Sequence, residues 1–337
     1  MEYLPERKQE HQETKRVFIR SEIESADGTN KEIAVKLEKD GKPRALAFFD
    51  IDATLAELRF IYDGAIKELF PNVDPREITE TFRAGWGLGN SFREFDRMQC
   101  IYEGGKESWR DAEVYVRERL KEHQEEIDSL GTPAHEQADL YRKRFAEIVA
   151  RRADKFFEEN PEQFEAAKVK PIFRLAELYH RLGIPMVLMT ANENIAARKI
   201  AKYLGLSDLF IDIAADETME GGGKEKAMEY LMNRLREKGI EIPKDRIIIV
   251  GDSLRGDIGS GTKLKEHHVS GQRGILVIKD EEVLAELNAQ IANSPDLQRV
   301  VSEIDTEALL VDKVPLDSRG DPILSSKYRS QFLRKLP

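Results

Sequence analysis

Residues 45–54 read ALAFFDIDAT, a run of five apolar residues that leads directly into two aspartates separated only by Ile51. A short, continuously apolar run is typical of a strand that is covered on both faces, as in parallel sheets. Two carboxylates at the end of such a strand, Asp50 and Asp52, repel each other unless a cation compensates their charge. The stretch therefore predicts a buried parallel strand with a charged ligand at its end.

Farther along the chain, strand-like and helical segments alternate. Apolar strand-like runs and amphipathic helical runs follow one another from Phe173 onwards. Such alternation is typical of βα units, and it predicts an α/β fold with a doubly wound, Rossmann-like parallel sheet and helices on both faces. The expected strands are residues 184–190, 209–215, 246–250 and 274–279, and the expected helices are 173–183, 194–206 and 224–239.

The remaining segments suggest an extension at each end and an insertion. Residues 1–44 contain RVFIRSEIE and EIAVKLE on either side of ADGTN, a pattern that predicts a β-hairpin. Residues 57–167 are mostly helical in pattern and are broken by the glycine-rich GWGLGN at 85–90. Residues 281–337 form a C-terminal extension that starts with a helical run. The hairpin and this extension could cover sheet edges, bind the core or make a dimer contact.

Composition narrows the class of protein. The 337 residues carry a formal net charge of −10, which argues against a general nucleic-acid or anionic-membrane binder. No apolar run has the length of a signal peptide or a membrane span, so we expect a cytoplasmic protein with no membrane partner. Cys100, the one cysteine, is expected to be a buried apolar residue, and the adjacent His267 and His268 alone are weak signs of a metal site.

Several polar side chains follow the other expected strands. Because the carboxyl ends of parallel strands meet at one edge of a sheet, we expect these residues to lie near Asp50 and Asp52. Hard oxygen ligands with few His or Cys neighbours favour Mg²⁺, and a hydroxyl and an ammonium beside Mg²⁺ suit the remaining oxygens of a phosphoryl group. The residues are Thr190, Ala191 and Asn192 after one strand, Asp252 and Asp257 after another, and Lys224 at a helix start.

Taken in order, these residues resemble the four motifs of the haloacid dehalogenase superfamily. The aspartates of DIDAT, then Thr190, Lys224 and the stretch from Gly251 to Asp257 match the motifs over a core of residues 45–56 and 168–280. Ala53 stands where this family most often has glycine, which hints at a slightly different turn geometry. Lys224 lacks the following proline that is common in some branches.

The resemblance implies a role for each residue. Asp50 would be the nucleophile that forms an aspartyl-phosphate, and Asp52 would be the general acid–base. Lys224 would stabilise the nucleophile and the developing charge, and Thr190 with the following backbone N–H groups of Ala191 and Asn192 would bind phosphate. Mg²⁺ would be held by the side chains of Asp50 and Asp252 and by the backbone carbonyl of Asp52, while Asp257 would support the metal waters or Lys224.

The insertion at 57–167 resembles the helical cap of this family. A cap can exclude water and contact the leaving group. Its candidate specificity residues are Arg83, Asn90 and Arg93, which lie around the glycine-rich break. The alternative interpretation is that these three are surface residues beside a loop.

The leading hypothesis is a Mg²⁺-dependent phosphatase that acts on a small phosphorylated metabolite, as a monomer or homodimer. The resemblance favours this reaction over carbon–halogen or carbon–phosphorus cleavage, because an aspartate, Asp52, stands two residues after the nucleophile. The first alternative is a phosphomutase that uses the same residues. The others are a non-catalytic regulatory protein on the same fold, which the intact set of site residues disfavours, and a nucleic-acid end phosphatase, which the net charge disfavours.

Overall fold

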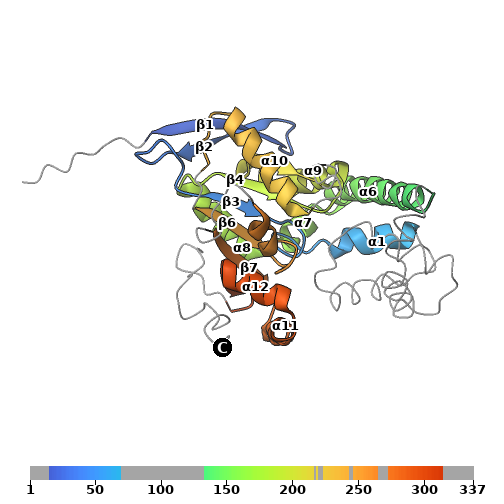
Figure 1. Ribbon diagram of the computed structural model, residues 1–337. Helices are drawn as coiled ribbons and strands as arrows, with labels where there is room; N and C mark the ends of the chain where they lie inside the picture. Colours follow the sequence, from blue (N-terminus) through green and yellow to red (C-terminus); the bar gives the residue numbers. More distant parts are fainter. Residues whose placement is uncertain are drawn as a thin grey trace, which may run out of the picture.

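Six strands form one parallel sheet in the order β5-β4-β3-β6-β7-β8 (Figure 1). The structure is a computed structural model that describes residues 15–69, 133–215, 218, 223–242, 246–264 and 272–313. The sheet confirms the predicted α/β fold class. The strands are β3 (Leu46–Phe49), β4 (Met186–Met189), β5 (Asp212–Ala214), β6 (Ile247–Gly251), β7 (Gln272–Ile278) and β8 (Asp305–Leu310).

Helices cover both faces of the sheet, and β3 shows how the sequence divides between them. Ala47 and Phe49 join an apolar cluster with residues of α8 and α9, whereas Leu46 and Phe48 join a second cluster with residues of α10, α11 and α12. All four side chains of β3 are buried, which explains why this strand is apolar throughout. The helices are α8 (Lys170–Arg181), α9 (Asn194–Tyr203), α10 (Lys224–Glu237), α11 (Glu281–Ala292) and α12 (Pro295–Glu303).

The predicted N-terminal hairpin is present and packs on the core. Its strands, β1 (Arg16–Glu24) and β2 (Asn30–Lys36), pair antiparallel. The backbone N–H of Glu22 donates to the carbonyl of Ile211 at 2.7 Å, beside the start of β5. The Glu22 carboxylate pairs with Lys238 at 2.6 Å, just after α10. Of the roles considered for this segment, the structure thus shows binding to the core.

The sheet continues beyond residue 280, where the predicted core ends. After α11 and α12 the chain returns as β8, which pairs with β7 along its whole length. β8 carries Asp305, Thr306 and Glu307 among its six residues, so it lacks the apolar run that marks the other strands. As the last strand of the sheet it has one strand neighbour, and such an edge strand tolerates polar side chains.

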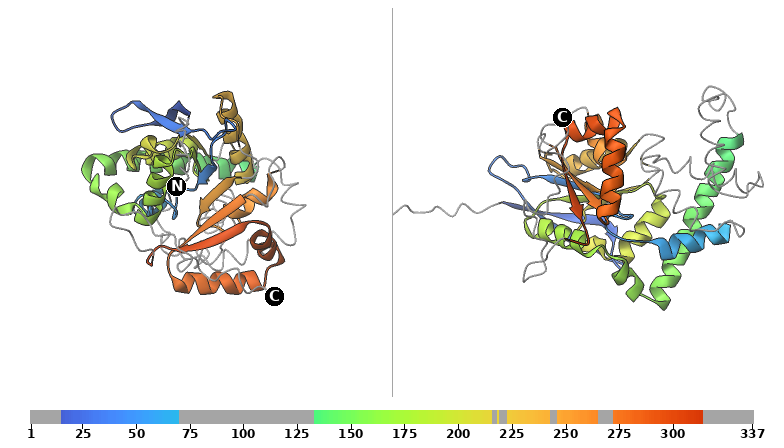
Figure 2. Two further views of the ribbon diagram at one scale, coloured as in Figure 1. Left: turned by 90° about the vertical axis from the view of Figure 1, so that its left-hand side faces the viewer. Right: turned by 90° about the horizontal axis from the view of Figure 1, so that it is seen from below.

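The described ends of the predicted cap are helical. α1 (Arg59–Leu69) and α6 (Pro133–Glu159) extend away from the sheet, and α7 (Glu162–Ala167) leads back to it (Figures 1 and 2). The Arg152 guanidinium of α6 lies against Gly64 of α1, and a Cβ at residue 64 would come within 1.9 Å of its nitrogen, so a larger residue there would displace this side chain. The boundaries of the cap stay a prediction. Several residues discussed from the sequence lie outside the described part of the chain: Arg83, Asn90, Arg93, Cys100, His267 and His268. None of the described helices has the length and apolar character needed to cross a membrane.

Candidate active site

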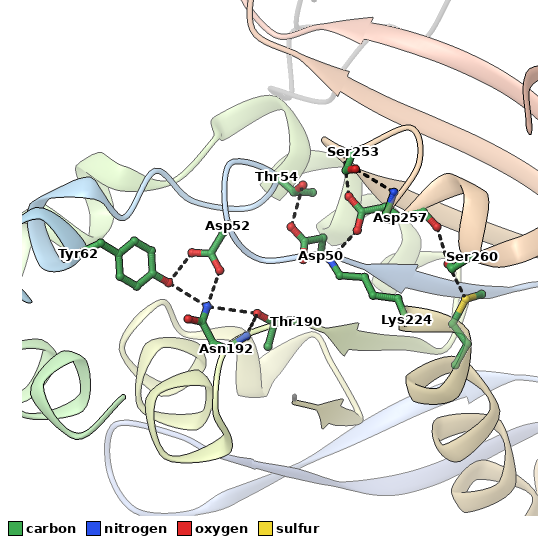
Figure 3. A network of polar contacts seen from close by, with 12 residues as sticks. Asp50, Asp52, Thr54, Tyr62, Thr190, Asn192, Lys224, Ser253, Asp257 and Ser260 are labelled. Atoms are coloured by element: carbon green, nitrogen blue, oxygen red, sulfur yellow. Dashed lines mark hydrogen bonds and ion pairs between the residues drawn. The ribbon is translucent and has the colours of Figure 1, made fainter. Parts of the chain in front are cut away.

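The strand ends and the start of α10 bring predicted residues together at the carboxyl end of the sheet. Figure 3 shows six of them: Asp50, Asp52, Thr190, Asn192, Lys224 and Asp257. Phe49 of β3 pairs with Val250 of β6, so Asp50 lies next to the end of β6, from which Asp252 and Asp257 follow. The carboxylates of these three aspartates offer oxygens that all lie within 4.8 Å of one another. The register of two neighbouring parallel strands therefore creates the acidic cluster that the sequence predicts.

Lys224 links two of these carboxylates. Its Nζ lies 2.5 Å from Oδ1 of Asp50 and 2.5 Å from Oδ1 of Asp257. The other oxygen of Asp257 accepts a hydrogen bond of 2.9 Å from the backbone N–H of Ser253. The Lys224 side chain is 14% exposed and the two carboxylates are almost fully buried. This geometry fits the role that the resemblance implies for Lys224.

The charges in this cluster are not balanced. Burial raises the pKa of Asp50 to about 7, against the opposing effect of Lys224 and with a further contribution from Asp257. Burial, then Asp257 and Asp50, raise the pKa of Asp252 well above its usual value. Burial acts to lower the pKa of Lys224, but Asp257 and Asp50 outweigh it, so that this pKa lies above the ordinary value. A further positive charge would relieve the repulsion among the carboxylates.

The donor set fits a hard divalent cation. Mg²⁺ is usually held by one or two carboxylates together with waters, and this cluster offers three converging carboxylates and no histidine. Asp50, Asp252 and Asp257 are the described side chains that could hold it. The Asp52 side chain is not part of this cluster, and the role of its backbone carbonyl as a metal ligand stays a prediction.

Gly251 allows Asp257 to lie against the end of β6. A Cβ at residue 251 would come within 2.3 Å of both Cγ and Oδ2 of Asp257. Only glycine leaves space for that carboxylate beside the strand. The position thus has a packing reason that follows from the site itself.

Asp52 belongs to a second group of polar side chains. Tyr62 donates from Oη to Oδ1 of Asp52 at 2.5 Å, and Asn192 donates from Nδ2 to Oδ2 at 2.5 Å. Thr190 Oγ1 accepts from the backbone N–H of Asn192 at 3.2 Å, and Ala191 is exposed between them. Thr190 and Asn192 were predicted to bind phosphate, which stays a prediction. The contact between the Asn192 side chain and Asp52 was not foreseen.

Sequence reasoning missed Tyr62. It lies on α1, ten residues after Asp52, and its ring stacks on Phe145 of α6 with centroids 6.3 Å apart. Burial, followed by the Asp52 charge, raises the pKa of Tyr62 well above its ordinary value. No motif marks this residue. The sequence shows only that Tyr62 lies in the segment that follows the DIDAT stretch. It does not show in which direction the phenol points.

Ala53 adopts the conformation that glycine favours. Its φ is 55°, the one positive φ of a non-glycine residue in the described part of the chain. The chain therefore keeps a left-handed turn here despite the methyl group, at a cost of about 1 kcal/mol.

We expect Ala53→Gly to raise the free energy of unfolding by about 1 kcal/mol or less, because relief of this strain is partly offset by the greater freedom of unfolded glycine. Urea unfolding of the two proteins measures the difference. The control is Ala285→Gly on the exposed face of α11, which should lower stability by roughly 1 kcal/mol. Equal destabilisation by both changes would contradict the strain at residue 53.

Comparison with known proteins places the chain in a family. No curated protein matches it in sequence. Similar solved structures include a haloacid dehalogenase-like family hydrolase, SP0104, from Streptococcus pneumoniae, with 13% identity and a TM-score of 0.43 over 80% of this chain and 95% of that one. A predicted phosphoglycolate phosphatase from Haemophilus somnus has 16% identity and a TM-score of 0.40 over 69% of this chain and 84% of that one. The magnesium-bound YfnB from Bacillus subtilis has 15% identity and a TM-score of 0.38 over 69% of this chain and 86% of that one.

The family assignment comes from the sequence match. The sequence model of the haloacid dehalogenase-like hydrolase family matches residues 45–264. This range is more than half of the chain and includes every residue of the acidic cluster. This match confirms the resemblance inferred from the ordered motifs, and the chain belongs to the haloacid dehalogenase-like hydrolase family.

Proposed function

We propose that this protein is a Mg²⁺-dependent phosphatase that hydrolyses a small phosphorylated metabolite through an aspartyl-phosphate. The observation that carries the proposal is the arrangement of three groups. A buried carboxylate, Asp50, is paired with the Lys224 ammonium, and a second carboxylate two residues later, Asp52, is held apart by donors of its own. One carboxylate is thus available for attack and another for proton transfer.

The first half of the reaction transfers the phosphoryl group to the protein. A carboxylate oxygen of Asp50 attacks phosphorus, and the bond from phosphorus to the leaving oxygen breaks. Asp52 gives its proton to that oxygen, so the leaving group departs as an alcohol. Lys224 stays near Asp50 and balances part of the charge on the phosphoryl oxygens.

The second half restores the protein. Asp52, now a carboxylate, takes a proton from a water molecule, whose oxygen attacks phosphorus. The bond between phosphorus and Asp50 breaks, and inorganic phosphate leaves. Mg²⁺, when bound by Asp50 and Asp252, would supply positive charge that offsets the repulsion between the carboxylates and the phosphate.

The test is release of inorganic phosphate from a panel of phosphorylated sugars, glycolytic acids and nucleoside monophosphates, with Mg²⁺ and with excess chelator. We expect at least one good substrate, and a loss of roughly 100-fold in rate when the metal is removed, because metal charge contributes several kcal/mol to such transition states. Re-addition of Mg²⁺ should restore the rate. Undiminished release in chelator would contradict the metal dependence.

The same panel separates the phosphatase from a phosphomutase. A mutase would convert one phosphate ester into a positional isomer and release little inorganic phosphate. Phosphorus NMR of the reaction mixtures distinguishes the two outcomes, because each ester and free phosphate give separate signals. Isomerisation without release would replace the phosphatase proposal by the mutase.

A further inference from the structure

We propose that Tyr62 and Asn192 are positioning residues for Asp52, and that they act together by holding both oxygens of its carboxylate in the orientation needed for proton transfer. This inference rests on the proposed function, because it concerns the step in which Asp52 protonates the leaving oxygen. It adds Tyr62 to the site, and it gives a role to the side chain of Asn192, whose backbone N–H alone was predicted to bind phosphate.

Each oxygen of Asp52 has its own donor. Oδ1 accepts from the Tyr62 hydroxyl and Oδ2 accepts from the Asn192 amide, both at 2.5 Å (Figure 3). The last torsion of an aspartate side chain is soft, so a carboxylate with one partner can rotate freely over a wide range. Two donors on opposite oxygens fix that torsion.

The donors are themselves held in place. Asn192 Nδ2 also lies 2.9 Å from Tyr62 Oη and 3.2 Å from Thr190 Oγ1. The Tyr62 ring is stacked on Phe145, which fixes the phenol from the side of α6. The cluster therefore joins three segments: the turn after β3, the nearby helix α1, and the loop after β4, which is distant from both in sequence.

Both donors leave room for the proton that Asp52 exchanges. Each carboxylate oxygen has two lone pairs, and one donor, Tyr62 on Oδ1 or Asn192 on Oδ2, occupies one of them. The remaining lone pair can carry the proton toward the leaving oxygen. The pair can therefore hold Asp52 in both halves of the reaction without a change of partners, which is what a residue that alternates between acid and base requires.

This role predicts a particular dependence on the leaving group. A poor leaving group such as an alkoxide needs a well-placed proton donor, whereas 4-nitrophenolate departs without one. For Tyr62→Phe, which keeps the ring and its stacking, we expect kcat/KM, which covers the steps up to departure of the leaving group, to fall about tenfold on an alkyl phosphate and less than about twofold on 4-nitrophenyl phosphate. Asn192→Ala should show the same contrast between the two substrates.

A matched control exists elsewhere in the fold. Tyr203 of α9 also donates to an aspartate, Asp154 of α6, and it also stacks on a phenylalanine, Phe157. This pair contributes nothing to the acidic cluster or to the group around Asp52. Tyr203→Phe thus removes the same kind of hydrogen bond, and it should leave kcat/KM unchanged on both substrates.

The experiment separates failure of this inference from failure of the proposed function. If the unaltered protein with Mg²⁺ releases phosphate from neither substrate nor from any member of the panel, the proposed function falls and the inference falls with it. If it releases phosphate, but Tyr62→Phe and Asn192→Ala lower kcat/KM equally on both substrates or on neither, only the positioning role is wrong. Thermal unfolding of each variant shows whether it is folded; if one is not, the other tests the opposite oxygen of Asp52.

Discussion

Asp50→Asn should abolish phosphate release, with a fall in kcat of at least about 10⁴-fold, since removal of a covalent nucleophile leaves only binding and electrostatic contributions. The asparagine has nearly the same shape and can still accept from Lys224, so the site keeps its geometry. Phosphate release in the presence of Mg²⁺ measures the effect. The control is Asp154→Asn on α6, which alters a carboxylate outside the site and should retain full activity.

The same change should not weaken the fold. Asp50 has a pKa of about 7 in the folded protein, raised from 3.8 mainly by burial. An acid whose pKa is raised on folding makes the protein less stable as pH increases from about 4 to about 7, because the unfolded chain ionises first. Asparagine has no such charge. We therefore expect the metal-free variant to be at least as stable as the unaltered protein at pH 8.

Urea unfolding of both proteins without metal, at pH 5 and pH 8, tests this expectation. Between these two values the unaltered protein should lose more stability than Asp50→Asn. An inactive variant that is fully folded assigns the loss to chemistry. Residual activity close to that of the unaltered protein would show instead that phosphate does not pass through Asp50.

The sequence predicts the sheet well because its central strands are buried on both faces. β3, β4 and β6 are short, almost wholly apolar runs, and each is followed directly by a polar residue of the site. The sequence did not predict β8, because this strand lies at the edge of the sheet and carries polar residues. Its position is fixed by its pairing with β7. The sequence pattern therefore predicts a strand when both of its faces are buried. It does not predict an edge strand such as β8, which is placed by its pairing with a neighbouring strand.

The residues of the site also fall into those that the sequence predicts and those that it does not. Asp50, Asp252 and Asp257 are placed by the backbone at strand ends, so their meeting follows from the order of strands. Tyr62 reaches Asp52 only because α1 packs against α6 and turns the phenol inwards. Such a contact depends on the angle between two helices and on a side-chain rotamer, neither of which a single sequence specifies.

Lys224→Met should damage both activity and stability. Lys224 is the first residue of α10, and a positive charge at a helix N-terminus is unfavourable with respect to the helix dipole. Its position is explained by Asp50 and Asp257, each 2.5 Å from its Nζ. Without the ammonium, two buried carboxylates lose their common partner. We expect the free energy of unfolding of the metal-free protein to fall by about 3 kcal/mol.

Activity should fall with it. Lys224 pairs with Asp50, and in the proposed mechanism its ammonium would balance negative charge that develops on the phosphoryl oxygens. We expect kcat to fall by about 10³-fold in the presence of Mg²⁺, the upper range for loss of one fixed charge or donor at a transition state. Because bound Mg²⁺ stabilises only the folded form, the added cation should also recover part of the lost stability.

Lys226, two residues farther along the same helix, is the matched control. Its side chain is 59% exposed and it pairs with Glu229 at 3.7 Å, so this pair contributes at most about 0.5 kcal/mol to stability. Lys226→Met should unfold at the same urea concentration as the unaltered protein and keep its kcat. If instead Lys226→Met lost activity and Lys224→Met kept it, Lys226 rather than Lys224 would be the lysine of the family motifs. The ion pairs of Lys224 would then stabilise the fold without serving the reaction.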